Sequence, residues 1–228
     1  MNIEYFRNNI LTKELKILSK LHIVAFAASC CEQLFPFYKT FSKMENWGDP
    51  QIPRKALDTI WSIAKGESVD LDEVWLLSDR CCSRGICPSD DDRNSHYESS
   101  SLFIEAEHLI YSICIILDSY TEITAYDAIS ISNYVERTLE YYINDFDASF
   151  QKKCQGYTLK EQIENFQHHP LVVNEVAKET EDLQKLKEAQ VLTLDFLEWL
   201  RTSSRKEGWV FINFLKESRS PTATTDRP

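Results

Sequence analysis

A glutamate and a histidine between Leu102 and Leu117 have a spacing that could support metal chemistry. Glu105 and His108 are three positions apart in a mostly apolar stretch. This spacing places both side chains on one face of a helix, as in helical bundles that bind two metal ions through Glu-x-x-His motifs. Such a centre needs a second motif, and the sequence contains no second copy. We therefore favour a buried histidine paired with the neighbouring glutamate and predict no metal. A metal-dependent helical-bundle enzyme using Glu105 and His108 is the alternative.

A second group of candidate ligands lies in a segment that is rich in Ser, Asp, Gly and Pro. Cys81, Cys82 and Cys87, with His96 nearby, offer soft ligands for zinc. The Cys-Cys-x4-Cys pattern lacks the two-residue spacer that lets paired thiolates chelate one ion. Three interpretations stay open for the Cys81–Cys87 loop: a metal site, a redox-sensitive pair of exposed thiols, and thiols with no specific role.

Motifs of other common chemistries are missing from the sequence. The chain has five glycines and contains no G-x-G-x-x-G, Walker-type or G-x-S-x-G sequence. Cys30 and Cys31 fall in an apolar helical pattern, where thiols are usually inert. His168 and His169 precede a helix, where a neutral capping role is the simple account. We predict no catalytic residue and no cofactor, and the sequence leans away from an enzyme.

The charge of the chain limits its partners. The formal net charge is −11 at pH 7, and an acidic surface repels phosphate backbones, so we expect no nucleic acid. The run Asp90, Asp91 and Asp92 lies in the segment predicted to be an exposed loop. It is either a solvated loop or the first contact of a basic partner.

Cysteine usage and hydropathy bear on the compartment. Seven cysteines, an odd number in a chain too long for a disulfide scaffold, are typical of reduced thiols. No apolar run approaches the ~20 residues that cross a bilayer. We expect a cytoplasmic protein that is not attached to a membrane.

Helical periodicity dominates the pattern that positions these residues. Predicted helices cover 3–19, 50–64, 102–117 and a long segment from Pro170 to about Arg205. Pro36 interrupts the apolar pattern that starts near Ile23, so a kink or break is expected there. Gly48 and Asp49 are expected to close one helix and cap the next. Further capping residues are expected to start helices at Asp70, Thr124 and Thr158. The short helix that starts at Asp70 carries Leu71, Val74, Trp75 and Leu77.

No segment alternates with the period of two that a strand requires. The prediction is an all-α fold: a single-domain helical bundle of about seven to eight helices with one long C-terminal helix. The domain is expected to span residues 1–216, with an exposed loop at about 80–100 and a disordered tail at 217–228.

One pattern resembles a known family. It consists of Phe26, Ala28, Cys31, Glu32, Pro36, Tyr38, Phe41, Gly48, Asp49, Gln51, Ile52, Arg54, Leu57, Asp58, Ile60 and Trp61. This pattern resembles the YjaG-like family of bacterial proteins, a family of unknown function, and continues more weakly through Pro170, Val172, Glu175, Arg201, Arg205 and Gly208. The resemblance implies a single all-α domain and no assigned activity, cofactor or catalytic residue.

We interpret the most polar members of this pattern as structural. Arg54 and Asp58, one helical turn apart, can pair with each other or with Asp49 and Glu32 of neighbouring elements. A structural ionic network is favoured over a buried binding site.

The function expected from these observations is a non-enzymatic, acidic protein-binding module. A concrete form is an immunity-like or regulatory protein that masks a basic effector, with Asp90, Asp91 and Asp92 as the partner-binding residues. The alternatives are the metal-dependent enzyme described above and a structural homo-oligomer that uses the helix from Pro170 as its interface.

Overall fold

The computed structural model describes residues 2–88 and 102–219, and these ranges are helical apart from turns and one isolated bridge between Arg84 and Cys87. The all-α prediction is confirmed. In chain order the helices are α1 (Ile3–Tyr5), the π-helix η1 (Phe6–Leu11), α2 (Thr12–Leu15), α3 (Lys20–Glu45), α4 (Gln51–Ala64), α5 (Leu71–Cys82), α7 (Phe103–Ser119), α8 (Ala125–Phe146), α9 (Ala148–Cys154), α10 (Leu159–Gln167), α11 (Pro170–Glu188) and α12 (Leu194–Arg219).

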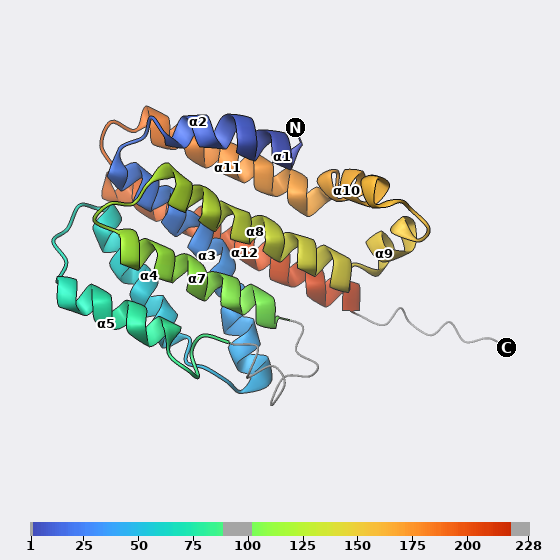
Figure 1. Ribbon diagram of the computed structural model, residues 1–228, viewed down its shortest axis with the longest axis horizontal. Coiled ribbons are helices and arrows are strands. Elements are labelled where there is room, and N and C mark those ends of the chain that lie inside the picture. The colour runs from blue at the N-terminus through green and yellow to red at the C-terminus, as the bar shows by residue number, and fades with distance from the viewer. Residues whose placement is uncertain (1, 89–101, 220–228) are drawn as a thin grey trace.

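Helix α3 runs through the middle of the molecule and packs against α4, α7, α8, α11 and α12 (Figure 1). It is apolar almost all round between Ile23 and Cys31, which explains its burial on every side. Of the kink or break expected at Pro36, the break does not occur, because α3 continues through Pro36 to Glu45. Proline removes one backbone hydrogen bond, and the buried side chains of Phe37, Tyr38 and Phe41 hold the following turns in the core.

The turn after α3 follows the prediction except that Asn46, and not Gly48, ends the helix. Asn46 takes the left-handed conformation that ends α3, and Gly48 also has a positive φ of 71°. A Cβ on Gly48 would stand 2.7 Å from the hydroxyl oxygen of Tyr38, whose O–H donates to the carbonyl of Ile86 at 2.8 Å. Asp49 then accepts the backbone N–H of Gln51 at 2.9 Å and caps α4.

The N-terminal segment differs from the expected regular helix over residues 3–19. It ends at Leu15 and contains the wider π-helical turn η1. Helical spacing groups Tyr5 with Leu11, Leu15 and Leu18 on one apolar face, but Tyr5 is exposed and Arg7 is buried. The π-turn changes which side chains face inward, because it breaks the 3.6-residue period from which the face was predicted.

The segment predicted as one helix from Pro170 to Arg205 is divided in two. Helix α11 ends at Glu188, and α12 starts at Leu194 and runs back along the molecule in the opposite direction (Figure 1). Thr193 accepts the N–H of Phe196 at 3.2 Å, which caps the new helix. The long helix predicted from Pro170 is therefore not one element, and the last helix, α12, extends to Arg219. With the N-terminal segment and this one each divided, the number of helical segments within residues 2–88 and 102–219 exceeds the expected seven to eight.

Two further expectations concern membrane-crossing helices and the segment that contains the three aspartates. Within the described ranges, no helix combines the length and the apolar composition that crossing a membrane would require. Asp90, Asp91, Asp92 and His96, and the end of the predicted tail from residue 220, lie outside the described residues.

Candidate functional site

One buried carboxylate, that of Glu32 on α3, accepts hydrogen bonds from three arginines and a tryptophan. Arg54 on α4 donates from Nη1 and Nη2 at 3.1 and 2.9 Å. Trp61 donates from Nε1 at 3.0 Å, and Arg201 on α12 donates from Nε at 2.9 Å. Arg205, one turn further along α12, donates from Nε at 3.3 Å. Because Glu32 is fully buried, these charge-assisted bonds compensate a charge that would be costly alone.

A second carboxylate, that of Asp58, completes the arrangement that we call the Glu32 cluster (Glu32, Arg54, Asp58, Trp61, Arg201 and Arg205). Asp58 accepts Arg54 Nε at 3.0 Å and also Arg201 Nη2. The predicted pairing of Arg54 with Asp58 and Glu32 is therefore present. Asp49 takes no part, since its carboxylate caps α4. The cluster joins α3, α4 and α12 into one unit.

Gly208 explains how α12 approaches α3 closely enough to reach this cluster. A Cβ at this position would stand 2.3 Å from the backbone carbonyl oxygen of Gln33. Only glycine allows this separation between the two helices. The sequence contained a signal for this close approach, because Gly208 lies within one helical turn of Arg205.

Glu105 and His108 are both buried on α7 but do not pair with each other. His108 Nδ1 lies 2.9 Å from Thr138 Oγ1 on α8, and its ring contacts that of Tyr134 at 4.9 Å between centroids. Burial raises the pKa of Glu105 to about 8 and lowers that of His108 to about 4. In the part of the chain that the structure describes, no three His, Cys, Asp or Glu side chains are placed to share one ion. The favoured pairing of Glu105 with His108 was therefore wrong.

A layer of buried charges between α11 and the body was not anticipated from the sequence. Asp182 is paired with Lys178, and burial raises the pKa of Asp182 to about 6. Glu179 Oε1 lies 3.6 Å from Arg7 Nη2. Both carboxylate oxygens of Glu175, fully buried, have no hydrogen-bond partner among the described residues.

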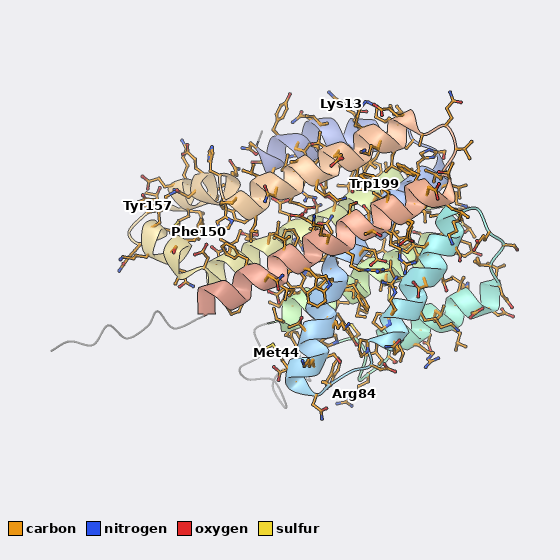
Figure 2. The ribbon with its side chains drawn as sticks, turned by 180° about the vertical axis from the view of Figure 1, so that it is seen from behind. Lys13, Met44, Arg84, Phe150, Tyr157 and Trp199 are labelled. Atoms are coloured by element: carbon orange, nitrogen blue, oxygen red, sulfur yellow. The ribbon has the colours of Figure 1, made fainter. Side chains whose placement is uncertain are left out.

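Trp199 of α12 stands at the edge of this layer (Figure 2), with Lys185 Nζ 4.4 Å from its ring centroid. Val172, Val176, Leu183 and Leu186 of α11 are buried, as the helical spacing indicated, whereas Leu194, which the same spacing placed with them, is exposed at the start of α12. Helix α11 also turns charged residues inward. Periodicity of apolar residues could not show this.

An acidic cleft of about 360 Å³ lies between α4 and α5. Its lining carries four carboxylates and one lysine, and comprises Lys55, Asp58, Thr59, Ser62, Glu67, Ser68, Val69, Asp70, Glu73 and Val74. Lys55 Nζ pairs with Glu73 at 2.7 Å across the cleft. Asp58 belongs to both the cleft and the Glu32 cluster, so the cluster fixes the α4 wall of the cleft.

Helix α5 lies at the outer edge of the bundle (Figure 1) and exposes large apolar side chains. The helix buries Val74 and Leu77 but leaves Trp75 76 % exposed, together with Leu71 and Leu76. Asp72 and Asp79 are exposed on the same helix. We call Leu71, Asp72, Trp75, Leu76 and Asp79 the α5 face. The sequence placed Leu71 and Trp75 with the apolar residues of this helix, but successive positions at 100° cannot all face the core.

The cysteines of the predicted loop are distributed differently from a shared metal site. Cys81 is buried and Cys82 is exposed at the end of α5, while Cys87 is partly buried beyond it. Cys82 Sγ contacts Cys114 Sγ of α7 at 2.7 Å. Cys114 lies far from this group in sequence, so the contact could not be found from spacing.

Comparison with known proteins shows where similar chains occur. Residues 10–212 match a family described as "Protein of unknown function (DUF416)". The "Uncharacterized protein YjaG" of Salmonella typhimurium and that of Salmonella typhi are each 40 % identical over 53 residues, which is 23 % of this chain and 27 % of each relative. A solved DUF416 family protein from Shewanella baltica shares the fold, with a TM-score of 0.68 and 19 % identity. That alignment covers 86 % of this chain and 93 % of the other.

Proposed function

Because the chain belongs to the DUF416 family, whose function is unknown, we propose its function from its surface: it is a protein-binding module that docks a basic partner on the α5 face. The observation that carries this proposal is Trp75, which is 76 % exposed on α5, a helix at the outer edge of the bundle (Figure 1). Tryptophan is the residue type most enriched among the side chains that dominate binding energy at interfaces.

The energetic argument starts from the area that Trp75 presents. A tryptophan side chain buries about 150–250 Å², and Trp75 is 76 % exposed. Burial of this exposed part at about 25 cal/mol per Å² stabilises by roughly 3–5 kcal/mol before the costs of association. Leu71 and Leu76 flank it with further exposed apolar surface. Contact with a partner removes this surface from water.

Charge complementarity identifies the chemistry of the partner. Residues 70–80 carry four carboxylates, those of Asp70, Asp72, Glu73 and Asp79, and a single cation, Arg80. The whole chain has a net charge of −11. A partner with lysines and arginines around an apolar pocket fits this arrangement, because opposite potentials accelerate encounter and exclude acidic competitors.

The α5 face rests on a fixed support. Val74, Leu77 and Cys81 are buried beneath it, and Ser78 Oγ donates to Asp118 Oδ1 of α7 at 2.6 Å. On its other side, α5 faces α4 across the acidic cleft, and Asp58 of the Glu32 cluster lines the α4 wall of that cleft. A surface that is already ordered loses little conformational entropy on binding.

We favour an immunity-like or regulatory form of this function, in which the module masks a basic effector. Two acidic features support this form: the α5 face, and the run Asp90 to Asp92 in the sequence. Asp90 follows Asp79 by eleven residues. The aspartates themselves remain a predicted first contact.

Selection from a displayed library of random peptides tests the docking surface. Peptides are selected on the unaltered full chain alone, so that their affinity for Trp75→Ala is a result of the experiment and not a condition of the selection. We expect the enriched peptides to combine lysine or arginine with apolar residues. A synthesised peptide should bind Trp75→Ala at least about 30-fold more weakly by calorimetry, which corresponds to roughly 2 kcal/mol.

Leu159→Ala is the matched control, because Leu159 is 73 % exposed on α10, away from the α5 face. Its affinity for the peptide should equal that of the unaltered chain. Enriched peptides that bind Trp75→Ala and the unaltered chain equally, or that carry net negative charge, would overturn the proposal.

A further inference from the structure

Two thiols from different helices meet where α5 ends against α7. Cys82 is the last residue of α5 and is exposed, whereas Cys114 on α7 is only 7 % exposed. Their Sγ atoms lie 2.7 Å apart. We propose that Cys82 and Cys114 form a reversible thiol–disulfide site that reacts with low-molecular-weight disulfides such as oxidised glutathione. This site goes beyond the docking function and does not depend on it.

The environments of the two thiols assign them different roles. Exposed Cys82 is accessible to a reagent in solution, and the thiolate form is the nucleophile. Burial raises the pKa of Cys114, and its contact with the Cys82 thiol raises it further. Cys114 therefore reacts second, because it is buried and less readily deprotonated than an exposed thiol. Once Cys82 is bonded to the reagent, the Cys82 thiol that raises the pKa of Cys114 is gone.

The exchange proceeds in two balanced steps. The Cys82 thiolate attacks one sulfur of glutathione disulfide, the reagent's S–S bond breaks, and one glutathione thiolate leaves and takes up a proton. Cys114 Sγ, after losing its proton to solvent, then attacks Cys82 Sγ and displaces the second glutathione. Two protein thiols are oxidised to one disulfide, and one glutathione disulfide is reduced to two glutathione thiols.

The neighbouring cysteines are less suited to this chemistry. Cys81 is buried, and burial raises the pKa of its thiol to about 12. Cys87 is partly buried in the turn beyond α5. The site is thus a pairing between α5 and α7, and not the Cys81–Cys87 group that the sequence indicated. A bond between Cys82 and Cys114 would tie the end of α5 to α7.

Mass spectrometry of the reduced full chain after incubation with oxidised glutathione tests the assignment. We expect the intact protein to lose the mass of two hydrogen atoms and carry no adduct, and peptide mapping to join the segments that contain Cys82 and Cys114. Cys114→Ser should instead retain one glutathione on Cys82. Cys82→Ser, which lacks one of the two thiols, should form no bridge and should leave Cys114 reduced, while Cys154→Ser should behave as the unaltered chain.

Peptide mapping of the unaltered protein decides the question even where a cysteine variant folds poorly. A bridge between Cys82 and Cys114 that dithiothreitol reverses supports the site. A stable glutathione adduct on Cys82 with a reduced Cys114 would overturn it. So would a bridge formed from Cys81 or Cys87 in place of either assigned thiol.

Discussion

Glu32 uses its two oxygens to accept donors from α4 and α12 at once. Arginine is suited to this role because its planar guanidinium presents several N–H donors in fixed directions, which a lysine ammonium does not. Arg201 and Arg205, four positions apart on α12, both donate from Nε to this carboxylate. The polar residues of the family pattern thus act as a joint, and Asp58 extends that joint into the acidic cleft.

Glu105 and His108 illustrate how burial alone changes ionisation. Desolvation of Glu105 favours its neutral acid, and desolvation of His108 favours its neutral imidazole. Glu105 therefore keeps a proton in the folded state between pH 4.5 and about 8 that it loses in the unfolded state. Its contribution to stability is full below this window and is lost as the pH rises through it.

Glu105→Gln should remove this dependence. Between pH 6.5 and 8, the unaltered protein should lose about 1.5 kcal/mol more unfolding free energy than the variant, because the titration of His108 is common to both proteins and cancels in the comparison. Urea denaturation at both pH values measures the difference. Glu107→Gln, a partly buried neighbour on α7, serves as the control and should keep the original slope. Equal slopes for Glu105→Gln and the unaltered protein would contradict the raised pKa.

At the scale of elements, α12 comes into close backbone contact with α3 at Gly208. The helix backbone there leaves no room for a methyl group beside the Gln33 carbonyl. Alanine has a higher helix propensity than glycine by roughly 1 kcal/mol, so an unobstructed site would gain stability from the exchange. The sign of the change therefore tests the contact directly.

Gly208→Ala should destabilise the protein by a net of about 1–2 kcal/mol: a contact of 2.3 Å with backbone puts the overpacking cost in the upper part of the typical range, about 2–3 kcal/mol, and helix propensity offsets about 1 kcal/mol of it. Chemical denaturation measures this loss. Lys206→Ala, at an exposed position of the same helix, should stay within about 0.5 kcal/mol of the unaltered protein. A Gly208→Ala variant more stable than the original would show that α12 does not approach α3 as described.

Sequence patterns predicted the elements better than the relations between them. Thr124 and Thr158 start helices with capping boxes as expected, because these signals are local. The division between α11 and α12 escaped prediction, since a short turn left the apolar stripe in phase on both sides. The contact of Cys82 with Cys114 and the exposure of Trp75 depend on how α5 packs against α7, which no local pattern contains.

Over the whole molecule, charge is distributed in two different ways. Buried carboxylates such as Glu175 and Asp182 lie between α11 and the body, where burial raises their pKa values. The carboxylates of α5 and the acidic cleft lie at the outer edge and face solvent. Only the second group can meet a partner. This arrangement makes the α5 face, with Trp75 at its centre, the main point of the functional account.

Photo-crosslinking in host cells tests this point most directly, with benzoylphenylalanine replacing Trp75 in one chain and Leu159 in another. The account predicts a single basic protein crosslinked at position 75 and absent at position 159. Its purified form should bind Asp72→Lys/Asp79→Lys more weakly than the unaltered chain, most strongly at low salt. Adducts that are the same at both positions, or a partner whose affinity ignores the two charge reversals, would contradict it.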